Sequence, residues 1–309
     1  MKKATMTFFA ALALLFAGIA SAYEIGTGST SGMFYPTGQK ICGLAAEKFI
    51  DCQAVPSGGS ADNVAKVEDG ELDAGLAMLP VAKESGLPYV VMNVGEAAFV
   101  VANPTAAERI RKLVGGMDAA VFPAALKLAG KGRVTFVTIG ENSGETALMR
   151  QQLEAAGAPA SALKSVSSIA EFVRTLTSDN RAFGFVTRIP NPGNEIFLQM
   201  KKAKLEILGA FNPALKDETT KVSVVEVAGV KVKTPVTPVA FVYDEGNADA
   251  KEVLEIVKGV TLKDILPAPS TWAKVWGAIK GAAASMKEMT AAQASALKEK
   301  VEAKLANIQ

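Results

Sequence analysis

The sequence contains no histidine. This absence excludes Ser-His and Cys-His nucleophile pairs, histidine-ligated zinc and acid–base catalysis by imidazole. An enzyme built from this chain would need paired carboxylates or a Ser-Lys pair. No Ser-x-x-Lys lies at a suitable turn from strand to helix, since Ser161 to Lys164 is on ordinary helical or loop sequence. We therefore expect a protein that is not an enzyme and has no catalytic residues or metal site.

An excess of charge of one sign is also missing. Without Lys2 and Lys3, which lie in the N-terminal leader, the chain has 31 basic residues against 31 acidic ones, and no long block of one sign. Nucleic acid would require a basic stripe, and an anionic membrane surface would require a polybasic segment. The composition therefore predicts no nucleic-acid partner.

Long apolar runs are absent except at the N-terminus. A cationic start, Lys2-Lys3, precedes an apolar run from Phe8 to Ala20, and Ala20-Ser21-Ala22 is a small-x-small cleavage site. The run is about 13 residues, too short for a membrane-spanning helix. Residues 1–22 thus read as a cleaved signal peptide, with an uncleaved anchor as the alternative. We expect the mature protein in the periplasm.

Cysteine is scarce, with Cys42 and Cys52 as the two representatives. In an oxidising compartment an even number of cysteines favours a disulfide. It would close a loop of about ten residues and contribute about 2–3 kcal/mol. The alternative is two buried free thiols, because a helix between them could hold the sulfur atoms apart.

The residues that are present alternate between strand and helix patterns. The first unit predicts strands over residues 23–28, 53–56 and 72–78, with helices over residues 36–49 and 61–69 between them. Glycine-rich loops follow the first two strands. A second unit predicts a strand over residues 134–139 and a helix over residues 144–156, then a helix over residues 168–178 and a strand over residues 182–187. The apolar residues of the second helix share one face. Such alternation indicates parallel strands with right-handed crossovers. Two such units predict two α/β lobes with a cleft between them.

Two later segments complete the pattern. Residues 236–243 form an apolar strand that could return the chain to the first lobe. Residues 290–307 predict a helix whose apolar stripe packs against the protein or, alternatively, binds a partner.

Loops at the carboxyl ends of parallel strands are where ligands bind in open α/β sheets. Glycine lets a backbone approach a ligand closely, and the free N–H groups of a helix start attract carboxylate or phosphate. Ser60 and Ser143 are placed to cap the helices after two of these loops, so capping and ligand contact are both open. Neither a phosphate-binding loop nor a complete dinucleotide motif is present. We expect no nucleotide and no cofactor. Arg188, in a turn beside the cleft, is a candidate charged partner for a ligand.

Several segments resemble the TAXI subfamily of TRAP-transporter solute-binding proteins. The likeness is strong over about residues 23–80 and patchy, but in register, to about residue 260. The matching runs include Ile25-Gly26-Thr27-Gly28-Ser29-Thr30-Ser31-Gly32-Met33-Phe34-Tyr35-Pro36, Pro56-Ser57-Gly58-Gly59-Ser60-Ala61-Asp62-Asn63, Ile139-Gly140-Glu141-Asn142-Ser143-Gly144-Glu145-Thr146 and Phe185-Val186-Thr187-Arg188-Ile189-Pro190-Asn191-Pro192. The cysteine pair also looks like that family.

The resemblance implies a type II, Venus-flytrap periplasmic binding protein with a ligand cleft between its α/β lobes. Lobe I would comprise residues 23–99 and 231–309, and lobe II residues 100–230. Its partners would be a small organic acid or amino acid and the subunits of an ion-driven membrane permease. The alternatives are a binding protein of an ABC importer and an exported ligand sensor on the same fold.

The family's ligand contacts carry over to loops of both lobes. They fall on Thr27, Gly28, Ser29, Ser31, Phe34, Tyr35, Ser57, Gly58, Gly59, Ser60, Asn142, Ser143, Thr146 and Asn191. The chain departs from the family pattern at Glu145, where a neutral residue is usual. A carboxylate at that helix start would disfavour an anionic ligand group.

Overall fold

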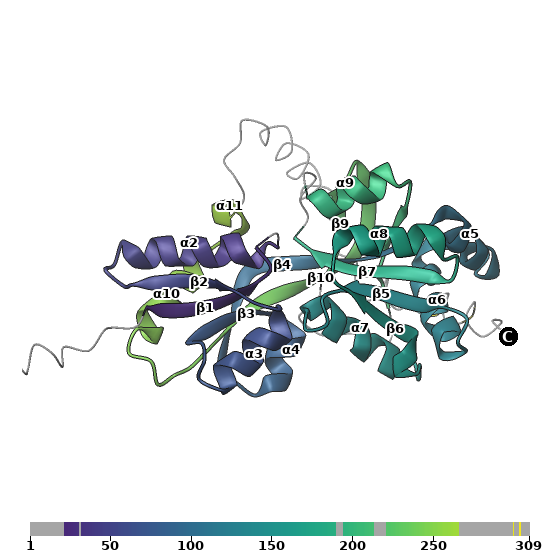
Figure 1. Cartoon of the computed structure of the whole chain (residues 1–309). Coiled ribbons are helices and arrows are strands. Elements are labelled where there is room, and N and C mark those ends of the chain that lie inside the picture. The colour runs from purple at the N-terminus through teal and green to yellow at the C-terminus, as the bar shows by residue number, and fades with distance from the viewer. Residues whose placement is uncertain are drawn as a thin grey trace, which may run out of the picture.

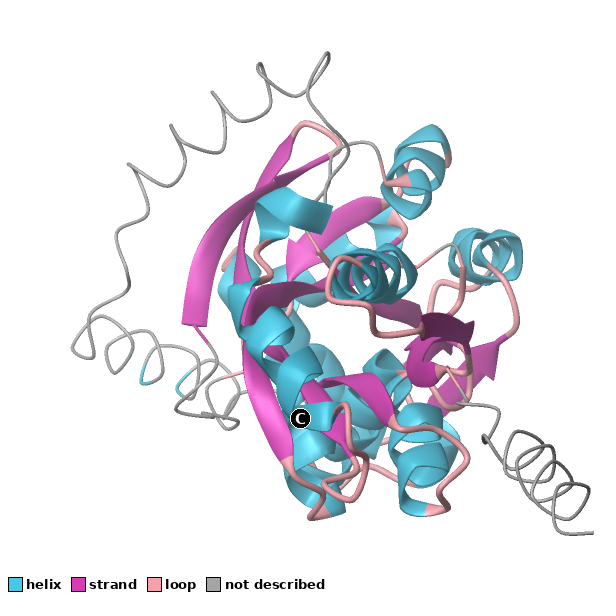
Figure 2. Cartoon of the chain, turned by 90° about the vertical axis from the view of Figure 1, so that its left-hand side faces the viewer, coloured by secondary structure: helices cyan, strands magenta, loops and turns pink. Residues whose placement is uncertain are grey.

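The computed structural model describes residues 22–30, 32–189, 194–212 and 221–265, together with residues 299 and 303. In this part of the chain a ten-stranded sheet runs in the order β2-β1-β3-β10-β4-β7-β5-β6, with β8 paired to β4 and β9 to β10. Figure 1 shows two lobes side by side, joined where β4 and β10 cross from one to the other. Helices cover both faces of the sheet (Figure 2).

Lobe I begins with the expected strand–helix alternation. Its parallel strands are β1 (Tyr23–Gly28), β2 (Cys52–Pro56) and β3 (Ala74–Met78). Its helices are α2 (Phe34–Ala46), α3 (Ser60–Glu68), α4 (Leu79–Ser85), α10 (Ala250–Gly259) and α11 (Leu262–Ile265). The expected helix over residues 36–49 is thus displaced toward the N-terminus and starts at the Phe34-Tyr35-Pro36 turn. A disulfide joins Cys42 on α2 to Cys52 at the start of β2, so the open alternative of free thiols was wrong.

Lobe II contains the second unit. Its strands are β5 (Thr135–Ile139), β6 (Leu163–Val166), β7 (Ala182–Arg188), β8 (Glu206–Gly209) and β9 (Lys221–Val227). Its helices are α5 (Pro104–Leu113), η1 (Asp118–Ala120), α6 (Val121–Gly130), α7 (Gly144–Ala155), η2 (Ala160–Ala162), α8 (Ile169–Ser178) and α9 (Glu195–Lys202). On α8, Phe172 and Leu176 are fully buried and Ile169 and Val173 pack beside them, which confirms the expected apolar face.

Two long strands connect the lobes. They are β4 (Tyr89–Ala102) and β10 (Val230–Tyr243), which pair antiparallel with each other. The C-terminal half of β10 returns to lobe I and pairs with β3, with Val239 opposite Met78, as expected for residues 236–243. The antiparallel strand β10, which lies between β3 and β4, completes a two-lobed α/β fold. The strand over residues 89–102 was missed from the sequence, although it is rich in valine.

The apolar core divides between the lobes. One cluster of buried residues fills lobe I and includes Met92 and Val94 on β4. Two further clusters fill lobe II on the two faces of its sheet, and they take up β4 from Ala97 onward. The core therefore changes lobe on β4 near Glu96. The lobe limits given above stay a prediction. The expected signal peptide, residues 1–22, lies outside the described residues except for Ala22, and so does the expected C-terminal helix apart from residues 299 and 303.

Candidate functional site

The loop of lobe I that follows β2 is tied to strands β1 and β3 by a buried side chain, Asn63. Its Nδ2 donates to the carbonyl oxygens of Gly26 (3.0 Å) and Leu76 (2.7 Å), and its Oδ1 accepts from the Ser57 hydroxyl (2.5 Å). A Cβ on Gly26 would collide with the Asn63 amide. Asn63 therefore fixes the loop after β2 against the sheet, a role that its position in a helix did not reveal.

Two of the expected ligand contacts have hydroxyls that already bond within lobe I. Thr27 is fully buried and its Oγ1 donates to the Val55 carbonyl (2.9 Å). Ser60 was expected to cap α3, but Gly59 precedes the helix, at φ 111° and ψ −156°, a backbone region open chiefly to glycine. The Ser60 hydroxyl instead accepts the Met78 backbone N–H (3.1 Å). The expected cap was wrong because the end of β3 competes for that oxygen.

The loop after β5 starts α7 in the expected way. Ser143 is the N-cap, and its Oγ accepts the Thr146 backbone N–H (3.2 Å). The Thr146 hydroxyl is fully buried within 2.7 Å of both Thr138 Oγ1 and the Gly140 carbonyl. Thr146 therefore shapes the loop from beneath, whereas Asn142 is exposed above it.

Glu145 was expected to repel an anionic ligand from the start of α7. Its side chain is only 2% exposed and turns back onto the sheet. One carboxylate oxygen accepts the Ile139 backbone N–H (2.9 Å), and the other accepts the Thr187 N–H (3.2 Å) and the Arg188 guanidinium (2.5 Å). The Glu145 charge is thus compensated inside lobe II, and the expected repulsion loses its basis.

Arg188 lies at the end of β7 with its side chain 21% exposed. Burial acts to lower the pKa of Arg188, but the Glu145 and Glu96 carboxylates outweigh it and raise that pKa. Nη1 of Arg188 donates hydrogen bonds to Glu145 and to the Thr187 carbonyl. Its Nη2 and Nε have no hydrogen-bond acceptor among the described residues. Arg188 can therefore hold Glu145 and still offer donors to a ligand.

A second buried carboxylate, Glu96, faces the same cluster from β4. It is 7% exposed and accepts a hydrogen bond from the Thr187 hydroxyl (3.1 Å). Burial and the nearby Glu145 raise the pKa of Glu96 to about 7, against the opposing effects of Arg188 and Thr187. An acidic residue inside the apolar stretch 89–102 was the sequence signal for this group, and it was missed together with the strand.

The loops of the two lobes touch each other, and glycine makes this contact close. A Cβ on Gly59 would lie 3.2 Å from Ser143 Cα, and one on Gly58 would lie 3.3 Å from Asn142 Cβ. A Cβ on Gly144 would collide with the Ser60 hydroxyl. We call this contact, residues 57–60 against residues 142–144, the interlobe seam. Its glycines permit the approach of one lobe to the other, rather than only that of a ligand.

The seam brings two helix N-termini together, those of α3 and α7. Among the described residues, the backbone N–H groups of Ala61, Asp62, Gly144 and Glu145 have no hydrogen-bond acceptor. Such orphan donors, together with the two helix dipoles, favour an anionic group.

The remaining expected contacts are more scattered. Gly28 lies opposite Gly59, Ser29 is exposed, Phe34 is buried in the lobe I core and Tyr35 is half-buried beside it. Ser31 and Asn191 lie outside the described residues. In the described part of the chain, no three His, Cys, Asp or Glu side chains gather as a metal site. No single helix there is long and apolar enough to cross a membrane, although α5 and η1–α6, bent by 94°, pass that test as a pair.

Comparison with known proteins gives one family match and distant structural likenesses. Residues 25–86 match the model of the NMT1-like family, which covers β1 to the end of α4. The ligand-binding core of GluR0 in complex with L-glutamate is 13% identical, with 78% of this chain and 94% of that chain aligned at a TM-score of 0.49. An ABC-type phosphate transport receptor from Vibrio cholerae is 11% identical, with 78% and 96% aligned at a TM-score of 0.45. No curated protein sequence is significantly similar to the chain. The family match thus falls on the lobe I half of the seam.

Proposed function

We propose that this chain is an exported solute-binding protein that captures a small organic acid or amino acid for a TRAP-type membrane permease. The observation that carries the proposal is the seam itself. Helix N-termini from two lobes meet there with backbone donors that have no acceptor in the described part of the chain, and the strands β4 and β10 join the two lobes.

The charges around the seam support an anionic group on the solute. Glu145, the acidic residue nearest the start of α7, is already bonded to Arg188 and two backbone N–H groups. Asp62 in the first turn of α3 accepts the Gly58 N–H (2.8 Å) and pairs with Lys66 (3.0 Å). Both acids are thus compensated by the protein, so a carboxylate at the seam would meet donors rather than unpaired negative charge.

Export and delivery to a permease rest on the sequence and the disulfide. The leader has the organisation of a signal peptide, and disulfides persist mainly outside the reducing cytoplasm. The TRAP assignment is supported by the resemblance of residues 23–80 to the TAXI subfamily.

A thermal-shift screen of amino acids and mono- and dicarboxylates tests the binding function. At least one such solute should raise the melting temperature, and calorimetry should then give its Kd. Indifference to every small solute would contradict the proposal. Uptake of that solute into cells only when a TRAP permease and this protein are both expressed tests the transport assignment.

A single-charge substitution locates the site. Asn142→Asp adds a negative charge at the exposed edge of the seam and should weaken binding of a carboxylate about threefold to fivefold. Gln53→Glu adds the same charge on exposed β2, at the end of that strand away from the seam, and should leave the Kd unchanged. Equal effects of the two variants would place the solute elsewhere.

A further inference from the structure

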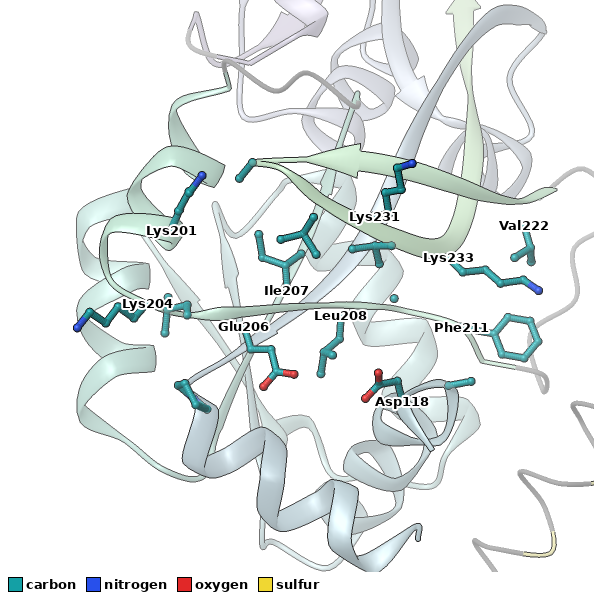
Figure 3. Close-up of a pocket in the computed structure, with 17 residues that line it drawn as sticks. Asp118, Lys201, Lys204, Glu206, Ile207, Leu208, Phe211, Val222, Lys231 and Lys233 are labelled. Atoms are coloured by element: carbon teal, nitrogen blue, oxygen red, sulfur yellow. The ribbon is translucent and has the colours of Figure 1, made fainter. Parts of the chain in front are cut away.

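A groove lies in lobe II between strands β8 and β10, which meet at one point and diverge from it. Strand β8 and the N-terminal half of β10 cross at Gly209, where a Cβ would overlap the Lys233 carbonyl. Near the crossing, Thr234 Oγ1 donates to the Ala98 carbonyl and accepts the Ala210 N–H (3.1 Å). Away from it, β8 stays on β4 while β10 leaves with β9 as a hairpin. The resulting space has a volume of about 710 Å³ (Figure 3).

The walls of this groove are mainly aliphatic. Figure 3 shows Ile207 and Leu208 of β8 in its middle and Phe211 and Val222 at one end. Leu205, Ala228 and Val232 complete the apolar lining, and each is less than a tenth exposed. A volume of this size and an apolar lining suit a small molecule with a hydrocarbon chain.

The rim of the groove is cationic. Its acidic residues, Asp118 and Glu206, are both paired with Arg111, which also binds Glu108. Four lysines of the rim are exposed, and no ion pair is seen for them among the described residues: Lys201, Lys204, Lys231 and Lys233. Glu226 nevertheless lies opposite Lys231 in the β9–β10 ladder. They lie at both ends of the groove and above it (Figure 3).

We propose that this groove is a second binding site, for an unbranched aliphatic chain with a terminal carboxylate. The chain lies along the apolar walls, and the carboxylate remains outside them, where it pairs with a lysine of the rim: Lys231 or Lys233, the exposed neighbours of Val232 on β10. The site is separate from the interlobe seam and stands whether or not a solute binds there.

An extended peptide fits the groove less well. Strand β8 is only four residues long, and the crossing at Gly209 closes the end at which a further strand would continue. An added strand would therefore find few backbone partners, whereas an alkyl chain needs none.

The test uses sodium dodecanoate below its micelle concentration, with dodecanol as the uncharged probe and butyrate as the short one. Calorimetry should give a Kd for dodecanoate at least tenfold lower than for dodecanol, and no measurable binding of butyrate. In NMR spectra of the labelled protein, dodecanoate should shift the signals of Ile207, Phe211 and Val232.

The charge-reversal variant Lys231→Glu/Lys233→Glu should weaken dodecanoate binding tenfold or more and leave dodecanol binding unchanged, because both side chains are exposed. The matched control Lys48→Glu/Lys251→Glu makes the same charge change in lobe I and should bind dodecanoate normally. The proposal fails if dodecanoate does not bind, if both double variants behave alike, or if the NMR shifts fall on the seam. Preferential binding of an acidic peptide over dodecanoate would also overturn it.

Discussion

Glu96 gives the most direct test of the buried cluster between the lobes. Its carboxyl lies beside Thr187 on a strand that belongs to both lobes, and its pKa rises from 4.5 to about 7 in the folded protein. The substitution Glu96→Gln removes the titration and keeps an oxygen that can accept the Thr187 hydroxyl hydrogen. The variant therefore isolates the free energy of ionising this one buried group.

The magnitude follows from the pKa shift. Each unit corresponds to about 1.4 kcal/mol, so a shift from 4.5 to about 7 amounts to about 3 kcal/mol in total. Because the folded pKa is raised, this stabilisation is fully present below pH 4.5 and is lost as the pH rises through 7. Between pH 5 and pH 8 the wild-type protein should lose about 2–3 kcal/mol of unfolding free energy relative to Glu96→Gln.

Urea unfolding of both proteins at several pH values between 5 and 8 measures this difference. The exposed Glu68→Gln serves as the control, since it removes one carboxyl from the surface of α3. A difference between wild type and Glu96→Gln that is constant from pH 5 to pH 8, or that changes in the opposite direction, would refute the reasoning. So would an equal pH dependence in the control.

Three further substitutions test the packing. Gly144→Ala places a methyl group against the Ser60 hydroxyl of lobe I, so the lobes should close less completely and the radius of gyration from X-ray scattering should increase. The control Gly43→Ala has open space around the added methyl group and should leave the radius of gyration unchanged. Replacing Cys42 and Cys52 with alanine should lower the unfolding free energy by about 2–3 kcal/mol, and the same loss in reduced wild-type protein would attribute it to the disulfide. Tyr23→Phe should stabilise the protein by about 1 kcal/mol in urea unfolding, because the buried Tyr23 hydroxyl has no hydrogen-bond partner among the described residues; destabilisation would indicate a missed partner.

The sequence predicted the elements and their order better than the partners of polar side chains. Periodicity located the parallel units because each strand or helix buries one continuous apolar pattern. Ser143 and Ser60 show the limit of that reasoning. Both precede or begin a helix, but only Ser143 caps one, because the Met78 N–H at the end of β3 competes for Ser60. That competition depends on the spacing of two elements 18 residues apart, which no local pattern records.

The charged residues of the site show the same limit. Glu145 looked unfavourable for an anionic ligand as long as it was considered alone. Its partner Arg188 lies 43 residues away and reaches it only because β5 and β7 are neighbours in the sheet. The missed β4 hid Glu96 for a different reason. A long strand that crosses both lobes has no simple inside–outside alternation, since its environment changes along its length.

Arg188 and the two glutamates together connect the proposed solute site with the strand that joins the lobes. One guanidinium lies between two carboxylates, so the cluster is neutral while Glu96 is protonated and carries one excess negative charge once Glu96 ionises. Below pH 7, Arg188 needs to compensate only Glu145, and its remaining donors are available to an anion at the seam. Above pH 7, the ionised Glu96 carboxylate is a second negative charge that the Arg188 guanidinium has to compensate. Under the proposed function, capture of an anionic solute is therefore linked to protonation of Glu96, a residue of the strand β4 that joins the lobes.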